Sequence, residues 1–217
     1  MKPERNIFYQ LKSISLVIVK IYLPAIMLLF GLVIVRLIFK VDIGAITRDP
    51  LQLFEAPPFV GMVSNIGILC WCSAMAICFF SSKIIQKKFN DYKIAQFLFY
   101  SSVVTCILMI DDLFLFHEIV LPDYLHIQQI IIYPTYVIMI AAYLFKFYKT
   151  ILRTDYILLL LAFVFFGTSI IIDILSEHIV IPEVFFFEDG VKFLGVIGWA
   201  TYYIRTSFQE MTAQIHK

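Results

Sequence analysis

Long apolar runs separated by short polar connections dominate the pattern of hydrophobic and polar residues along this chain. Each run is about 20 residues or longer, the length of an α-helix that crosses a hydrocarbon core of about 30 Å. The runs lack the alternation of a β-barrel, and in lipid a helix satisfies its own backbone hydrogen bonds. The pattern therefore predicts an all-α membrane protein, a bundle of six transmembrane helices at roughly 21–39, 59–81, 95–120, 128–147, 156–181 and 186–208.

The connections between these runs are short, so we expect residues 1–217 to form a single polytopic membrane domain. Residues 1–20 are expected to be a cytoplasmic amphipathic lead-in, with Lys12 and Lys20 reaching the lipid headgroups. The basic N-terminus resembles the first part of a signal peptide. The apolar run that follows is too long for one, however, and no small-residue cleavage site comes after it. We therefore expect an uncleaved first helix.

Charge in the connections orients the predicted helices. Lysine and arginine gather in the second-to-third connection, the fourth-to-fifth connection and the C-terminal tail, at Lys83, Lys87, Lys88, Lys93, Lys146, Lys149, Arg153, Arg205 and Lys217. The third-to-fourth connection carries Asp123 and no basic residue, and the fifth-to-sixth carries Glu183. Basic residues are retained on the cytoplasmic side, so we expect both termini to be cytoplasmic. The abundance of isoleucine, phenylalanine and lysine is typical of AT-rich bacterial genomes and favours a bacterial inner membrane.

Composition supports the membrane assignment. Apolar residues make up 61% of the chain and charged residues 15%, against about 45–50% and about 25% in soluble domains. The net charge is +1, and no basic cluster lies away from the apolar runs, which argues against nucleic acid as a partner. The expected partner is the lipid bilayer, together with further copies of the chain or another membrane protein.

Two short polar motifs repeat 60 residues apart. Residues 117–123 read HEIVLPD and residues 177–183 read EHIVIPE, which agree class for class except that His and Glu are exchanged. Each motif ends a run that leads outward, and each is followed by another run. The third–fourth and fifth–sixth helices are therefore predicted to form a parallel internal repeat.

Acidic residues lie deeper in the predicted helices, upstream of each motif. Asp111 and Asp112 precede the first motif and Asp173 precedes the second, with Asp111 expected about two-thirds of the way across the membrane. A charged residue near mid-bilayer costs about 2.5–3.5 kcal/mol, so these acids are expected to face the inside of the bundle. Helical spacing places Asp111 with Glu118, and Asp173 with Glu177, on one face each.

The sixth run begins on the same side with Glu188, Asp189 and Lys192. Glu188 and Lys192 are four residues apart, in the order that favours an ion pair within the helix. The predicted polar cluster in the outer half of the membrane comprises Asp111, Asp112, His117, Glu118, Asp173, Glu177, His178, Glu188, Asp189 and Lys192.

Three functions are open to such a cluster. The first is structural: a buried network that fixes helix register in a structural or partner-docking membrane subunit. The second is a metal-dependent intramembrane hydrolase of a lipid or peptide bond, in which zinc, iron or manganese would activate water. Its ligands would come from His117, His178, Asp112, Asp173, Glu118 and Glu177. No His-Glu-x-x-His motif is present, and the sequence does not decide whether the protein is an enzyme.

The third function is proton or cation transport. Acids and histidines within membrane helices are the usual parts of proton relays. The inner half of such a path would be lined by hydroxyl groups, at Ser81, Ser82, Ser101, Ser102, Thr105, Tyr202 and Tyr203. No segment resembles a selectivity filter.

Overall fold

The computed structural model describes residues 7–40, 42–176 and 184–215. Within these ranges every regular element is a helix and no strand occurs, as the apolar pattern predicts. The chain divides into two compact units, Met1–Val60 and Gly61–Lys217.

The first unit consists of one long helix and two short ones. Helix α1 (Ile7–Phe39) runs without a break from the expected lead-in into the first apolar run. Helices α2 (Ile43–Thr47) and α3 (Pro50–Leu53) follow, each begun by an aspartate that caps it. Asp42 Oδ2 accepts the Gly44 amide at 2.9 Å, and Asp49 Oδ1 accepts the Leu51 amide at 2.8 Å. The position of the lead-in at the membrane surface stays a prediction.

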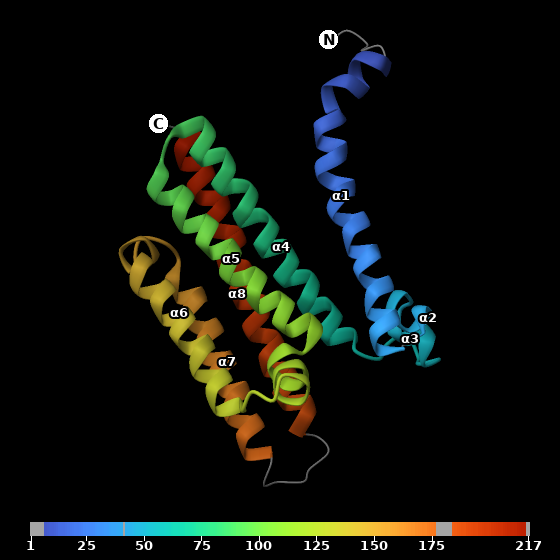
Figure 1. Ribbon diagram of the computed structural model, residues 1–217. Coiled ribbons are helices and arrows are strands. Elements are labelled where there is room, and N and C mark those ends of the chain that lie inside the picture. The colour runs from blue at the N-terminus through green and yellow to red at the C-terminus, as the bar shows by residue number, and fades with distance from the viewer. Residues whose placement is uncertain (1–6, 41, 177–183, 216–217) are drawn as a thin grey trace. The chain divides into compact units, whose positions relative to one another are not determined.

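The second unit is a helix bundle. Its elements are α4 (Met62–Ile84), the π-helix η1 (Ile85–Phe89), α5 (Tyr92–Phe114), the π-helix η2 (Phe116–Tyr124), α6 (Gln129–Ile151), α7 (Tyr156–Ser176) and α8 (Val184–Ile215). Helix α4 packs along both α5 and α8, α7 packs along α8, and α6 contacts α5 and η2 (Figure 1). Glycine lets α7 and α8 approach closely, because a Cβ atom at Gly198 would lie 3.3 Å from the Cβ atom of Ala162.

The lysine-rich connections of the bundle lie at one end, and the connection that carries the acids lies at the other. Asp91 at the start of α5 accepts the Gln214 amide of α8 at 2.7 Å, and Asp155 at the start of α7 pairs with Arg205 of α8. These bonds hold η1, the turn at residues 152–155 and the C-terminal part of α8 at one end, which we call the lysine end. The acid-bearing η2 lies at the opposite end (Figure 1). That the lysine end faces the cytoplasm stays a prediction.

Five of the described helical segments are long and apolar enough to cross a membrane: Ser15–Phe39, Met62–Phe89, Tyr92–Phe114, Ile131–Ile151 and Tyr156–Leu175. The bundle is thus compatible with a membrane protein. Helix α8 is not among the five, so the count of six is not confirmed. The reason is its composition, since the charged residues Glu188, Asp189, Lys192 and Arg205 lower the mean hydropathy of this helix.

The predicted internal repeat is not confirmed. Its second motif, residues 177–183, lies outside the described residues. In the described part, α7 packs closely along α8, whereas α5 packs mainly along α4 and makes fewer contacts with α6. The two predicted hairpins therefore differ in how their helices meet, and the repeat stays a prediction.

Candidate functional site

The end of α5 is reshaped by one residue in the left-handed region. Helix α5 ends at Phe114 because Leu115 has φ 52° and ψ 45°, a conformation that costs a side-chain-bearing residue about 1–2 kcal/mol. The chain continues as the nine-residue π-helix η2, although most π-helical segments are single turns, often at functional sites. Asp111 therefore lies in the last turn of α5, nearer the helix end than expected. Asp111 and Glu118 do not share the face of one continuous helix.

The Asp111 carboxylate binds both its own chain and a neighbouring helix. Its Oδ1 atom accepts the His117 amide at 3.0 Å and the Tyr136 hydroxyl of α6 at 2.6 Å. Its Oδ2 atom lies 2.5 Å from His117 Nδ1. Asp111 is buried, and its carboxylate accepts an amide from the first turn of η2. One carboxylate thereby fixes the turn between α5 and η2 and ties it to α6.

The neighbouring Asp112 joins three helices. Its Oδ1 atom lies 2.8 Å from Lys192 Nζ of α8, and its Oδ2 atom accepts the Trp71 indole N–H of α4 at 3.2 Å. The predicted pairing of Lys192 with Glu188 is thus wrong for the described residues, since the ion pairs of Lys192 are with Asp112 and Glu118. Lys192 thus pairs with carboxylates outside α8 rather than with Glu188, four residues earlier in its own helix.

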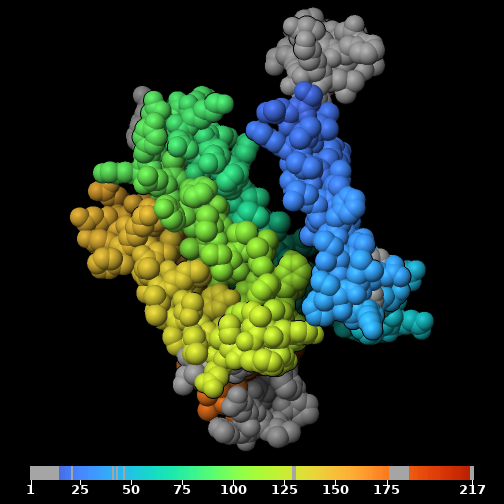
Figure 2. All heavy atoms as spheres, in the orientation of Figure 1, coloured from blue at the N-terminus to red at the C-terminus, as the bar shows by residue number. Residues whose placement is uncertain are grey.

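Glu118 connects the two halves of the site. Its Oε1 atom lies 3.4 Å from His117 Nε2 and 3.7 Å from Lys192 Nζ. We call the resulting set the ionic network: Trp71, Asp111, Asp112, His117, Glu118, Tyr136 and Lys192. The side chain of Glu118 is 45% exposed against 10% for Asp111, so the network opens at Glu118. Figure 2 shows η2, which carries Glu118, as a yellow-green lobe at the surface of this end.

The other predicted site residues lie around this network or outside the described chain. Asp173 of α7 accepts the Tyr133 hydroxyl at 3.5 Å, a long hydrogen bond. Glu188 is partly buried, and its main-chain carbonyl accepts the Ser169 hydroxyl at 3.3 Å. Asp189 is exposed. Glu177 and His178 lie outside the described residues.

The described residues do not form a metal site. No group of three or more His, Cys, Asp and Glu side chains in the described ranges could hold a metal ion. The geometry explains this, because the Lys192 ammonium contacts both Asp112 and Glu118, and His117 Nδ1 faces Asp111. Of the predicted ligands, Glu177 and His178 lie outside the part of the chain that the structure describes.

Three aromatic residues of the site escape the sequence pattern. Tyr133 and Tyr136 are typical of the membrane interface, and Trp71 lies in an apolar stretch between two cysteines. In the structure, each donates a hydrogen bond to an aspartate carboxylate. The sequence does hint at the two tyrosines through their position along the predicted membrane helices. Both lie near the outer end of the fourth predicted helix, at the same depth as the acids near the end of the third.

A second set of polar groups lies deeper in the bundle and carries no formal charge. Tyr203 donates to the Tyr143 hydroxyl at 2.9 Å, and the Tyr143 and Ser101 hydroxyls lie 2.8 Å apart. The Trp199 indole N–H donates to Thr105 Oγ1 at 3.1 Å. All five side chains are buried, and we call them the hydroxyl core. They belong to α5, α6 and α8, three of the helices that the ionic network also joins.

The chain was compared with known proteins. Residues 21–206 match a family described as a domain of unknown function, DUF8692. The chain belongs to this family. The match covers α4, α5, η2, α6 and α7 in full and α8 up to residue 206. Every residue of the ionic network therefore lies within the DUF8692 domain. No curated protein and no solved structure matches the chain.

Proposed function

We propose that this protein is a multi-pass integral membrane protein with a structural role, acting as a subunit of a membrane assembly of its own copies or of other proteins. The ionic network holds its helices in register at one end of the bundle. The observation that carries the proposal is the environment of Asp112, whose two oxygens are bound by Lys192 of α8 and Trp71 of α4. One side chain of α5 thereby fixes the positions of two other helices.

The energetics of buried ions explain why such a network enforces register. Breaking a buried ion pair by removing one partner costs about 3–5 kcal/mol, because the other charge is left without compensation. A shift of α8 by one turn moves Lys192 about 5.4 Å along the helix axis, away from both Asp112 and Glu118. Alternative packings of α4, α5 and α8 would leave Asp112 unpaired and are disfavoured by that energy.

A double-mutant cycle tests the proposal. Lys192→Met is expected to lower the free energy of unfolding in detergent by about 3–5 kcal/mol, and Asp112→Asn by a smaller amount. In the double variant the effects are expected to be less than additive, because neither charge remains unpaired. Unfolding in a denaturing detergent titration, followed by circular dichroism, gives the four free energies.

The matched control is Arg205→Gln, which removes a cation from the same helix at the exposed pair with Asp155. It is expected to change the unfolding free energy far less than Lys192→Met. Additive effects of Asp112→Asn and Lys192→Met, or an effect of Lys192→Met no larger than that of the control, would contradict the structural role.

One observation favours proton transfer as a second candidate function. A continuous chain of polar contacts links the half-buried Tyr136, the buried Asp111, His117 and the exposed carboxylate of Glu118. Such a chain can pass a proton between a buried site and the bundle surface. Purified protein in liposomes carrying a pH-sensitive dye tests this: proton flux that Asp111→Asn abolishes supports transport, and flux unchanged from empty liposomes argues against it.

The orientation of the bundle belongs to the same proposal. We infer that the end carrying η2 faces the outside of the cell and that both termini face the cytoplasm, in a bacterial inner membrane. Tyr124 of η2 is exposed, so Tyr124→Cys in a background without the native cysteines is expected to react with an impermeant thiol reagent in intact cells. Lys88→Cys, at the lysine end, is the control that should react only after the membrane is opened.

A further inference from the structure

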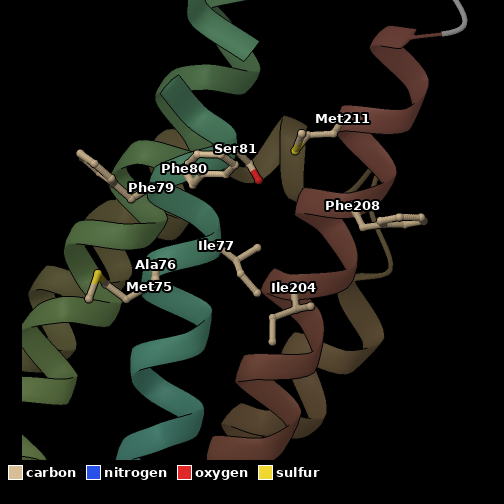
Figure 3. A pocket seen from close by; sticks show the side chains of 9 residues that line it. All are labelled: Met75, Ala76, Ile77, Phe79, Phe80, Ser81, Ile204, Phe208 and Met211. Atoms are coloured by element: carbon tan, nitrogen blue, oxygen red, sulfur yellow. The ribbon is translucent and has the colours of Figure 1, made fainter. Parts of the chain in front are cut away.

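A groove runs between α4 and α8 toward the lysine end of the bundle (Figure 3). Its volume is about 750 Å³. Ile77 of α4 and Ile204 of α8 lie opposite each other across it, and Phe80 and Met211 lie nearer the lysine end. Its lining is almost entirely hydrocarbon, thioether and aromatic, so it suits an acyl chain.

The groove continues into a second hollow with a different lining. This hollow has a volume of about 530 Å³ and shares Phe80 and Met211 with the first. It adds Lys83 at the end of α4 and Lys87 and Lys88 of η1. The two hollows together form one groove that is apolar along its length and cationic at its mouth. We call it the α4–α8 groove.

The described residues that line the mouth include three lysines and no carboxylate. The Lys83 ammonium lies 5.0 Å from the centre of the Phe99 ring, and the Lys88 ammonium lies 5.2 Å from the centre of the Phe89 ring. Asp91, at the same end of the bundle, is already engaged, since it caps α5 and accepts the Gln214 amide. An anion at the mouth would therefore gain from all three ammonium groups.

We propose that the α4–α8 groove binds one anionic phospholipid, with an acyl chain along Ile77 and Ile204 and the phosphate beside Lys83, Lys87 and Lys88. The proposal rests on the membrane location inferred above but not on the role of the ionic network. An acyl chain gains little by moving from the hydrocarbon of the bilayer into the apolar groove, because the two have similar polarity. The preference for one lipid over another therefore comes from the headgroup. Basic residues at a membrane surface each attract anionic lipids, and basic pockets between helices bind anionic headgroups.

Native mass spectrometry of the detergent-purified full chain tests the proposal, with phosphatidylglycerol and phosphatidylcholine as the two probes. One phosphatidylglycerol per chain is expected to bind about tenfold more tightly than phosphatidylcholine. The variant Lys83→Gln/Lys87→Gln/Lys88→Gln should lose that preference. Ile77→Trp, which fills the apolar part, should weaken binding of both lipids while the lysines remain.

The matched control is Lys146→Gln/Lys149→Gln/Arg153→Gln, which removes the same charge from the same end of the bundle outside the groove. It should keep the preference for phosphatidylglycerol. Equal loss in both triple variants would overturn the proposal, because the attraction would then come from the general charge of this end. Competition by inorganic phosphate at equal concentration, or a dimer that excludes lipid, would assign the groove to a free anion or to a second copy.

These outcomes are separable from failure of the proposed structural role. The three lysines and Ile77 lie outside the ionic network, and the binding measurement uses folded protein. A chain that fails the double-mutant cycle at Asp112 and Lys192 can still show the lipid preference, and the reverse also holds.

Discussion

The ionic network and the hydroxyl core bury polar groups in the same bundle by opposite means. The network uses formal charges and stays open at Glu118, whose side chain is 45% exposed. The hydroxyl core uses neutral donors and acceptors, and Tyr203 and Trp199 are 0% exposed. Charge needs compensation from other helices, whereas hydroxyl and indole groups need only one well-placed acceptor each.

The two sites therefore stabilise the fold through different properties of their side chains. In the hydroxyl core it lies in ring volume and packing, because each neutral hydrogen bond contributes only about 0.5–1.5 kcal/mol net. In the ionic network it lies in charge and hydrogen bonding. Substitutions that keep shape but remove polarity should therefore be milder in the hydroxyl core than in the network.

An effect as large as that of Lys192→Met is expected from removing ring volume in the hydroxyl core. Trp199 packs against Trp71, Phe163 and Tyr203 with ring centroids 5.6, 5.8 and 5.0 Å away. Trp199→Ala is expected to lower the free energy of unfolding by about 3–5 kcal/mol. Denaturant titration in detergent measures it. Trp199→Phe, which keeps most of the ring, is the control, and a similar loss in both variants would contradict a role based on volume.

A smaller effect is expected from a change of similar shape in the ionic network. His117→Phe keeps a ring but removes the contact of Nδ1 with Asp111, leaving a buried carboxylate with the Tyr136 hydroxyl and the backbone amide. The expected loss is about 1–3 kcal/mol. His117→Gln restores a donor and should recover part of it. If His117→Gln were less stable than His117→Phe, the ring rather than its nitrogen would be what matters.

Removing a single hydroxyl from the hydroxyl core should cost less. Tyr203→Phe deletes one donor, and Tyr143 keeps its contact with Ser101 at 2.8 Å. The expected loss is about 0.5–1.5 kcal/mol, measured in the same titration. A loss above that for His117→Phe would reverse the contrast drawn between the two sites.

The smallest effect is expected at the exposed pair of Asp155 and Arg205, which belongs to neither site. The hydrogen bond from Arg205, together with one from Gln209, lowers the pKa of the Asp155 carboxyl from its ordinary 3.8. A lowered pKa means that the pair stabilises the fold above pH 3.8 and that this stabilisation is lost as the pH falls through the lowered value. The difference between wild type and Arg205→Gln in thermal unfolding should therefore vanish in acid. A difference that persists there would show a contribution from packing instead.

Hydropathy was sufficient to predict the helices. It did not predict all of the helix ends or the number of helices that can cross a membrane. The runs of α4, α5, α6 and α7 are apolar enough to be read directly. Helix α8 is the exception, because its charged residues, together with its Tyr and Trp residues, lower its mean hydropathy. The end of α5 at Phe114 depends on the left-handed Leu115, and no glycine or proline marks that position.

Five of the ten residues of the predicted polar cluster lie in the ionic network, and the predicted partner of Lys192 was wrong. Asp111, Asp112, His117, Glu118 and Lys192 do come together as expected from their depth. The local rule of four-residue spacing assigned Lys192 to Glu188, because a sequence shows neighbours along one helix only. Which carboxylate of another helix reaches the ammonium depends on helix rotation and packing, which the apolar pattern does not fix.

The pairing of Asp112 with Lys192 also sets an order of events during synthesis. Ribosomes deliver helices to the membrane from the N-terminus onward, at about 5–20 residues per second. Asp111 finds His117 and Tyr136 within the next hairpin, whereas Asp112 must wait until α8 has been translated. Insertion of the last helix is therefore the step that brings a cation to Asp112 of α5. A nascent chain halted before Lys192 retains an unpaired acid that quality-control proteases can recognise.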